Sequence, residues 1–96
     1  MIIVREIFTA KPGMASKLAK MFKEWSKDMP GNTRVMTDAV GEYNTVVMES
    51  EYENLTAFEK SVEEYMKKSR AEKKSDDAPK YTEMYLTGRR EIFRVV

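Results

Sequence analysis

Glu6 is the residue whose type and position most clearly suggest a chemical role. It lies inside the β-branched and aromatic run Ile2–Ala10, which predicts a strand ended by a Lys-Pro-Gly turn. Because side chains alternate along a strand, Glu6 shares a face with Val4, Phe8 and Ala10. A carboxylate desolvated among apolar side chains is a candidate general base for a phenol or an acidic C–H.

The tetrapeptide REIF contains Glu6 and occurs near both ends of the chain, beginning at Arg5 and again at Arg90. If the two copies pair as antiparallel strands, Glu6 lies opposite Arg90 and Arg5 lies opposite Glu91, so opposite charges meet on both faces. Glu6 would then belong to a structural ion pair rather than to a catalytic site. The second copy would lie on an edge strand or on an arm that crosses to a partner subunit.

Three aromatic side chains are candidates for the walls of a pocket beside Glu6. Trp25 and Tyr65 fall on the apolar stripes of two predicted helices, and Tyr52 ends a predicted strand. The same positions equally suit ordinary core packing, with the polar tips of the rings reaching the rim.

Composition excludes several kinds of chemistry. The 96 residues include no cysteine and no histidine, which removes disulfides, thiol catalysis and the commonest metal ligand and general base. The 17 basic and 16 acidic residues give a net charge of +1 and are interspersed, which argues against a nucleic-acid partner. Glu49, Glu51 and Glu53 share a strand face along a line, so we expect a solvated rim or cross-subunit ion pairs rather than a metal site.

The chain shows no sign of membrane targeting. No apolar run approaches membrane-spanning length, and charge appears too early for a signal peptide. We therefore expect a cytoplasmic protein with no membrane partner.

Apolar periodicity predicts the order strand, helix, strand, strand, helix, strand. The helices begin near Met14 and near Asn54, and the polar stretch Arg70–Lys80 is expected to be a helix end and a loop. Gly88 is expected to break or kink the last strand before a C-terminal β-extension. The predicted strands are Ile2–Ala10, Arg34–Val40, Thr45–Tyr52 and Tyr81–Thr87, and the extension is Arg90–Val96.

This order is typical of a ferredoxin-like α+β fold, in which a four-stranded antiparallel sheet carries two helices on one face. We expect residues 1–96 to form one such domain. The other sheet face has no cover, and it would present Ile3, Ile7 and Val47 beside Arg5 and Glu49. Such mixed apolar content on a bare face predicts a homodimer.

Two segments resemble the dimeric α/β-barrel superfamily. REIFTAKPGMASKLAKMFKEW is similar to its opening strand, Pro-Gly turn and helix, and VVMESEYENLTAFEKS is similar to its third strand and second helix. The likeness covers most of the chain and is nearest to the NIPSNAP-like and antibiotic-biosynthesis-monooxygenase-like branches. It implies two sheets packed face to face as a barrel, with a pocket between each sheet and its helices.

The resemblance also bears on the candidate site. Haem-degrading members place Asn, Trp and His where this chain has Glu6, Tyr52 and Ser61, and NIPSNAP-like members tend to carry Arg at the position of Glu6. Haem ligation of that type is therefore excluded, and we expect no cofactor. Ser61 becomes a candidate polar contact for a ligand.

Two functions remain open at this stage. The first is a pocket for an apolar or aromatic small molecule with cofactor-independent monooxygenase-like activity, in which Glu6 is the base and Trp25, Tyr52, Ser61 and Tyr65 bind the substrate. The second is a non-catalytic dimeric ligand-binding or interaction protein. A buried, unpaired Glu6 facing a cavity would favour the first, and a salt-bridged or solvated Glu6 would favour the second.

Overall fold

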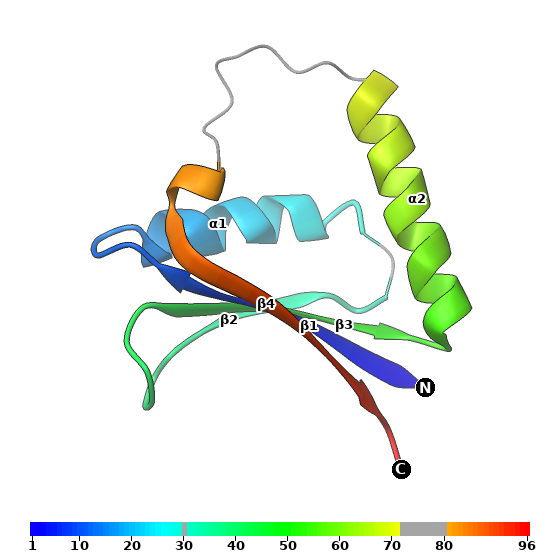
Figure 1. Cartoon of the computed structure of the whole chain (residues 1–96), viewed down its shortest axis with the longest axis horizontal. Coiled ribbons are helices and arrows are strands. Elements are labelled where there is room, and N and C mark those ends of the chain that lie inside the picture. Colours follow the sequence, from blue (N-terminus) through cyan, green and yellow to red (C-terminus); the bar gives the residue numbers. More distant parts are fainter. Residues whose placement is uncertain (30, 72–80) are drawn as a thin grey trace.

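The computed structural model describes residues 1–29, 31–71 and 81–96, which form one antiparallel sheet and two long helices (Figure 1). In chain order the elements are β1 (Ile2–Ala10), α1 (Ala15–Ser26), β2 (Arg34–Thr37), β3 (Thr45–Tyr52), α2 (Leu55–Ala71), the 3-10 helix η1 (Tyr81–Glu83) and β4 (Tyr85–Arg94).

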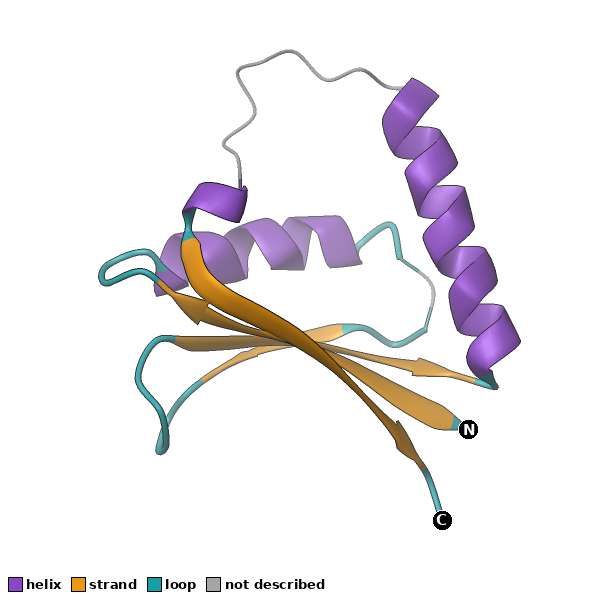
Figure 2. Cartoon of the chain, viewed as in Figure 1, coloured by secondary structure: helices purple, strands orange, loops and turns teal. Residues whose placement is uncertain are grey.

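The four strands lie in the order β2-β3-β1-β4, and all three pairings are antiparallel. Both α-helices lie on the same side of this sheet (Figure 2). The expected ferredoxin-like α+β fold is thereby confirmed. None of the helices in the described part of the chain is long and apolar enough to cross a membrane.

The main core lies between α1 and the middle of the sheet. Leu18 and Phe22 on α1 are fully buried against Ala10 of β1 and Val46 of β3. Leu18 and Phe22 are four residues apart, so they lie on one face of the helix and hold it against the strands.

A second, smaller core lies at the opposite end of the sheet, where α2 begins. Ile2, Val4 and Tyr52 are buried there beneath Ala57 and Phe58 of α2. Farther along, α2 rises away from the strands (Figure 1), and its apolar residues Tyr65 and Met66 are more than half exposed. The predicted apolar stripe of α2 is therefore packed against the sheet only near its start.

Two predicted boundaries differ in the structure, and a third cannot be compared. The second strand ends at Thr37 rather than Val40, because residues 38–44 form the loop to β3. Residues 81–83 form a 3-10 turn instead of the start of a strand. The predicted loop over Arg70–Lys80 falls largely on residues 72–80, which lie outside the described residues.

The predicted break at Gly88 is also absent, because β4 continues through it to Arg94. Gly88 lies opposite Phe8 of β1, and a β-carbon at this position would lie 2.8 Å from the Phe8 ring. The Phe8 ring therefore packs on the backbone of Gly88, where glycine has no side chain, and the strand stays paired there. The expected C-terminal extension is thus the second half of the fourth strand, at an edge of the sheet.

Candidate functional site

An ion pair between β1 and β4 forms the centre of the candidate site. The strand register places Glu6 opposite Arg90, and both lie on the sheet face that carries the helices, because Arg90 contacts Phe58 of α2. Arg90 donates an Nε–H hydrogen bond to Oε1 of Glu6 at 2.5 Å. Half of the Arg90 side chain and about a fifth of that of Glu6 are exposed. The pairing proposed from the repeated tetrapeptide is present.

Aromatic rings extend this ion pair toward α2. The Arg90 guanidinium carbon lies 5.2 Å from the ring centre of Phe58, a cation–π geometry. Phe58 in turn meets Tyr52 edge to face at 5.3 Å between ring centres. The Tyr52 hydroxyl lies 3.4 Å from that of Ser61, within hydrogen-bonding reach. Arg90 and Phe58 thus link three predicted site residues: Glu6, Tyr52 and Ser61.

A groove of about 360 Å³ runs between α2 and β4 beside this chain of contacts. Arg90 and Ile92 contribute the sheet side of the groove. The helix side consists of five α2 residues: Leu55, Phe58, Glu59, Val62 and Glu63. Its volume is within the range of small-molecule sites, and its lining combines apolar side chains with a few charges. It is open to solvent along α2.

None of the five predicted site residues is among those that line this groove, and Trp25 and Tyr65 also have no part in the contacts described above. Trp25 packs on Phe22, 5.5 Å between ring centres, at the edge of the main core under α1. Tyr65 lies on α2 more than half exposed. The aromatic wall that the sequence predicted from Trp25, Tyr52 and Tyr65 is therefore not assembled around Glu6.

Sequence reasoning missed the role of Phe58 at this site. It was assigned to the apolar stripe of the second helix, and nothing in its spacing marked it as the partner of an arginine. Arg90 was named as a possible partner of Glu6 but not as a lining residue. Its position follows from the antiparallel register of the two REIF copies.

The face of the sheet away from the helices carries a second charged cluster, centred on Glu49. Arg5 donates Nε–H to Oε1 of Glu49 at 2.7 Å, and Arg34 donates Nε–H to Oε2 at 2.6 Å. The Glu49 side chain is 6% exposed. The hydrogen bond from Arg5, together with the bond and charge of Arg34, holds the pKa of Glu49 below its ordinary value despite burial, which acts in the opposite direction. The sequence predicted a solvated rim or ion pairs between subunits. Glu49 instead pairs with two arginines of its own chain.

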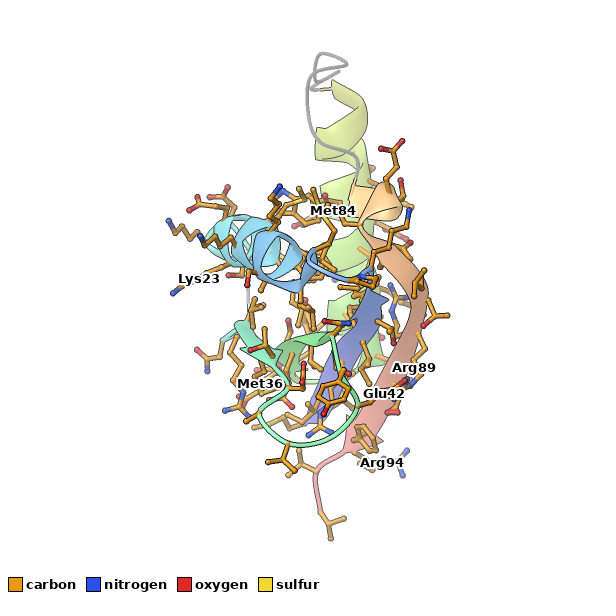
Figure 3. All side chains as sticks on the ribbon, turned by 90° about the vertical axis from the view of Figure 1, so that its left-hand side faces the viewer. Lys23, Met36, Glu42, Met84, Arg89 and Arg94 are labelled. Carbon is orange, nitrogen blue, oxygen red and sulfur yellow. The ribbon has the colours of Figure 1, made fainter. Side chains whose placement is uncertain are left out.

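The same face carries apolar residues around this cluster. The Arg5 guanidinium lies 5.1 Å from the ring centre of Phe93. Ile7 is buried, Val47 is partly buried, and Phe93 remains 45% exposed. Figure 3 shows the side chains on both sides of the sheet, with Arg89 and Arg94 extending from β4 at the outer edge.

A second groove, of about 390 Å³, lies at the end of β3 and is lined by Met1, Gly31, Asn32, Glu51, Tyr52 and Glu53. Gly31 has a φ of +90°, and a β-carbon there would meet the Glu51 carbonyl oxygen at 2.3 Å. Glycine is therefore required where this loop crosses the strand end. Glu51 and Glu53 are exposed here, and the described residues contain no cluster of three potential metal ligands.

Comparison with solved structures gives the class of fold. A NIPSNAP family protein from Agrobacterium tumefaciens aligns with a TM-score of 0.79 at 12% identity, over 99% of this chain and 92% of the other. A NIPSNAP domain protein from Burkholderia xenovorans aligns at 0.77 with 13% identity, over 100% and 95%. A candidate antibiotic biosynthesis monooxygenase from Deinococcus radiodurans aligns at 0.58 with 11% identity, over 100% and 93%.

The chain thus has the fold shared by NIPSNAP and antibiotic-biosynthesis-monooxygenase-like proteins, and the resemblance seen in the sequence is confirmed at the level of the fold. No protein-family model matches the sequence, and no curated protein matches it.

Proposed function

We propose that this protein is a homodimeric α/β barrel that binds an apolar or aromatic small molecule in the groove between α2 and β4. The observation that carries the proposal is the groove itself, where Leu55, Phe58, Val62 and Ile92 line the same space as Arg90, the ion-pair partner of Glu6. Leu55 and Ile92 are 54% and 42% exposed, so a bound apolar molecule would remove their surface from water.

The dimer is proposed from the sheet face away from the helices. Phe93 and Val47 leave apolar surface there beside the internally paired Arg5 and Glu49. Packing two such faces together would bury apolar surface without leaving the Glu49 charge unpaired. This arrangement also agrees with the barrel implied by the sequence resemblance.

A matched pair of substitutions tests the groove. The neutral fluorophore N-phenyl-1-naphthylamine should bind the wild-type chain, and Val62→Glu should abolish binding by placing a charge in the groove. Val40→Glu makes the same change in the loop before β3, where Val40 is 99% exposed, and should leave binding intact. Equal binding by both variants would place the ligand elsewhere and contradict the proposal.

Cofactor-independent monooxygenase-like activity is the second candidate function, and the hydrogen bond of Glu6 to the groove residue Arg90 is the observation that favours it. The base would act only after its carboxylate separates from Arg90, because the hydrogen bond from Arg90 occupies a carboxylate oxygen that would have to accept the proton. Glu6→Gln should then abolish oxidation of anthrone-like or quinol-like compounds, while Glu91→Gln on the opposite face should not. An unchanged rate in Glu6→Gln would eliminate Glu6 as the base.

The ion pair itself favours the non-catalytic alternative. A carboxylate that is salt-bridged in the folded chain is already explained by strand pairing. Ligand binding without turnover is therefore the first candidate function.

A further inference from the structure

We infer that the ligand of the α2–β4 groove carries a carboxylate, which binds the Arg90 guanidinium while the apolar remainder lies along α2. The inference rests on the proposed function of this groove and adds the chemical class of the molecule: an aromatic or aliphatic carboxylic acid.

Arg90 has unused hydrogen-bonding capacity. A guanidinium has five N–H donors in a rigid planar fork. Among the described residues, Glu6 is the hydrogen-bond partner of this side chain, and it takes only the Nε–H. The terminal nitrogens therefore keep their hydrogens for a further acceptor. Half of the side chain is exposed, so an acceptor can approach from the groove.

The guanidinium of Arg90 is also held in a fixed orientation. Glu6 holds it at Nε, and the Phe58 ring lies against it at 5.2 Å. An arginine held at one edge and against a ring loses little further freedom when it binds a second acceptor. Planar, weakly hydrated guanidinium groups are the preferred partners of carboxylates in such sites.

Arg90 lies next to the apolar lining of the groove. Ile92 lies two residues farther along β4 on the same face, and Leu55 and Val62 line the groove from α2. A molecule anchored at Arg90 can therefore place an aromatic ring or acyl chain on these residues. Glu59 and Glu63 also line the groove and would repel an anion that lies along α2. The carboxylate is therefore placed at Arg90, and a cationic probe tests recognition by the two glutamates instead.

Three probes that share one ring system test the charge preference: 2-naphthoate, the neutral 2-naphthamide and the cationic (2-naphthyl)methylammonium, each titrated at fixed ionic strength. We expect 2-naphthoate to bind about tenfold or more tightly than the amide, the usual size of one charge-assisted hydrogen bond. Arg90→Gln should remove this preference. Arg89→Gln, a neighbouring change on the opposite sheet face, should retain it.

The outcomes separate this inference from the function on which it rests. If acid and amide bind equally and Val62→Glu abolishes both, the groove is a binding site but the carboxylate inference is overturned. Tightest binding of the cationic probe would overturn it in favour of recognition by Glu59 and Glu63. If none of the three binds, the proposed function is overturned together with the inference.

Discussion

Glu6 and Arg90 lie 84 positions apart in the sequence and directly opposite each other in the sheet, joined by a 2.5 Å hydrogen bond. Each belongs to one copy of the tetrapeptide REIF. The two copies pair so that Arg5 also lies opposite Glu91, although the Arg5 side chain bonds to Glu49 instead. The register thus aligns the two copies of the repeat, and one of the two complementary charge pairs forms.

The Glu6–Arg90 pair should contribute modestly to stability. In a double-mutant cycle of Glu6→Gln and Arg90→Gln, we expect a coupling free energy of about 0.5–1 kcal/mol, because half of the arginine side chain is exposed and solvent screens the pair. Denaturant unfolding of the wild type, the two single variants and the double variant measures this coupling free energy. A coupling near zero would mean that the pair does not hold the register.

Glu49 should make stability depend on acid pH. Its pKa in the folded chain is below the ordinary value of 4.5, so its contribution is present above about that pH and is lost as the pH falls through the folded pKa. Glu49→Gln should cost about 1–2 kcal/mol at pH 7, after allowance for the exposed arginines, and should flatten the loss of stability in acid. Unfolding measured from pH 7 to pH 3 tests this. Glu91→Gln is the control, and an equal acid slope in wild type and Glu49→Gln would contradict the assignment.

Gly88→Ala should destabilise the chain by about 1–3 kcal/mol, because the new methyl group would press on the Phe8 ring. The cost should be smaller when Phe8 is replaced by leucine, since the obstructing ring is then gone. Thermal or denaturant unfolding of the single and double variants measures both effects. If the free-energy costs of Gly88→Ala and Phe8→Leu simply add in the double variant, the Phe8 ring is not what excludes a side chain at position 88.

Phe93 and Ile92 are neighbours on β4 that point to opposite faces, so they should separate assembly from binding. Phe93→Asp should weaken the proposed dimer about tenfold or more by placing a charge in an apolar interface, while leaving the groove intact. Ile92→Asp should weaken binding of N-phenyl-1-naphthylamine and leave the dimer intact. Sedimentation equilibrium and fluorescence titration measure the two effects. If the wild-type chain remains a folded monomer at high protein concentration, the proposed dimeric barrel is wrong.

Local patterns predicted the framework of the site. Alternation along Ile2–Ala10 placed Glu6 on the helix-bearing face, and the repeated tetrapeptide predicted its partner. These features depend only on strand geometry and charge matching, so they can be read from neighbouring positions.

Features that depend on the packing of distant elements were not predicted. The contact of Phe58 with Arg90 depends on where α2 crosses the sheet edge. The continuity of β4 at Gly88 depends on a ring from another strand. The pairing of Glu49 requires β3 to lie between the strands of Arg34 and Arg5, and sequence spacing within β3 suggested only an exposed acidic rim.

The location of bound ligand tests the central claim most directly. Backbone amide chemical shifts of the labelled protein would be followed during titration with 2-naphthoate. We predict that the largest changes occur at Phe58 and Val62 on α2 and at Arg90 and Ile92 on β4. Changes confined to the other groove, around Gly31, Asn32 and Glu53, would contradict the account.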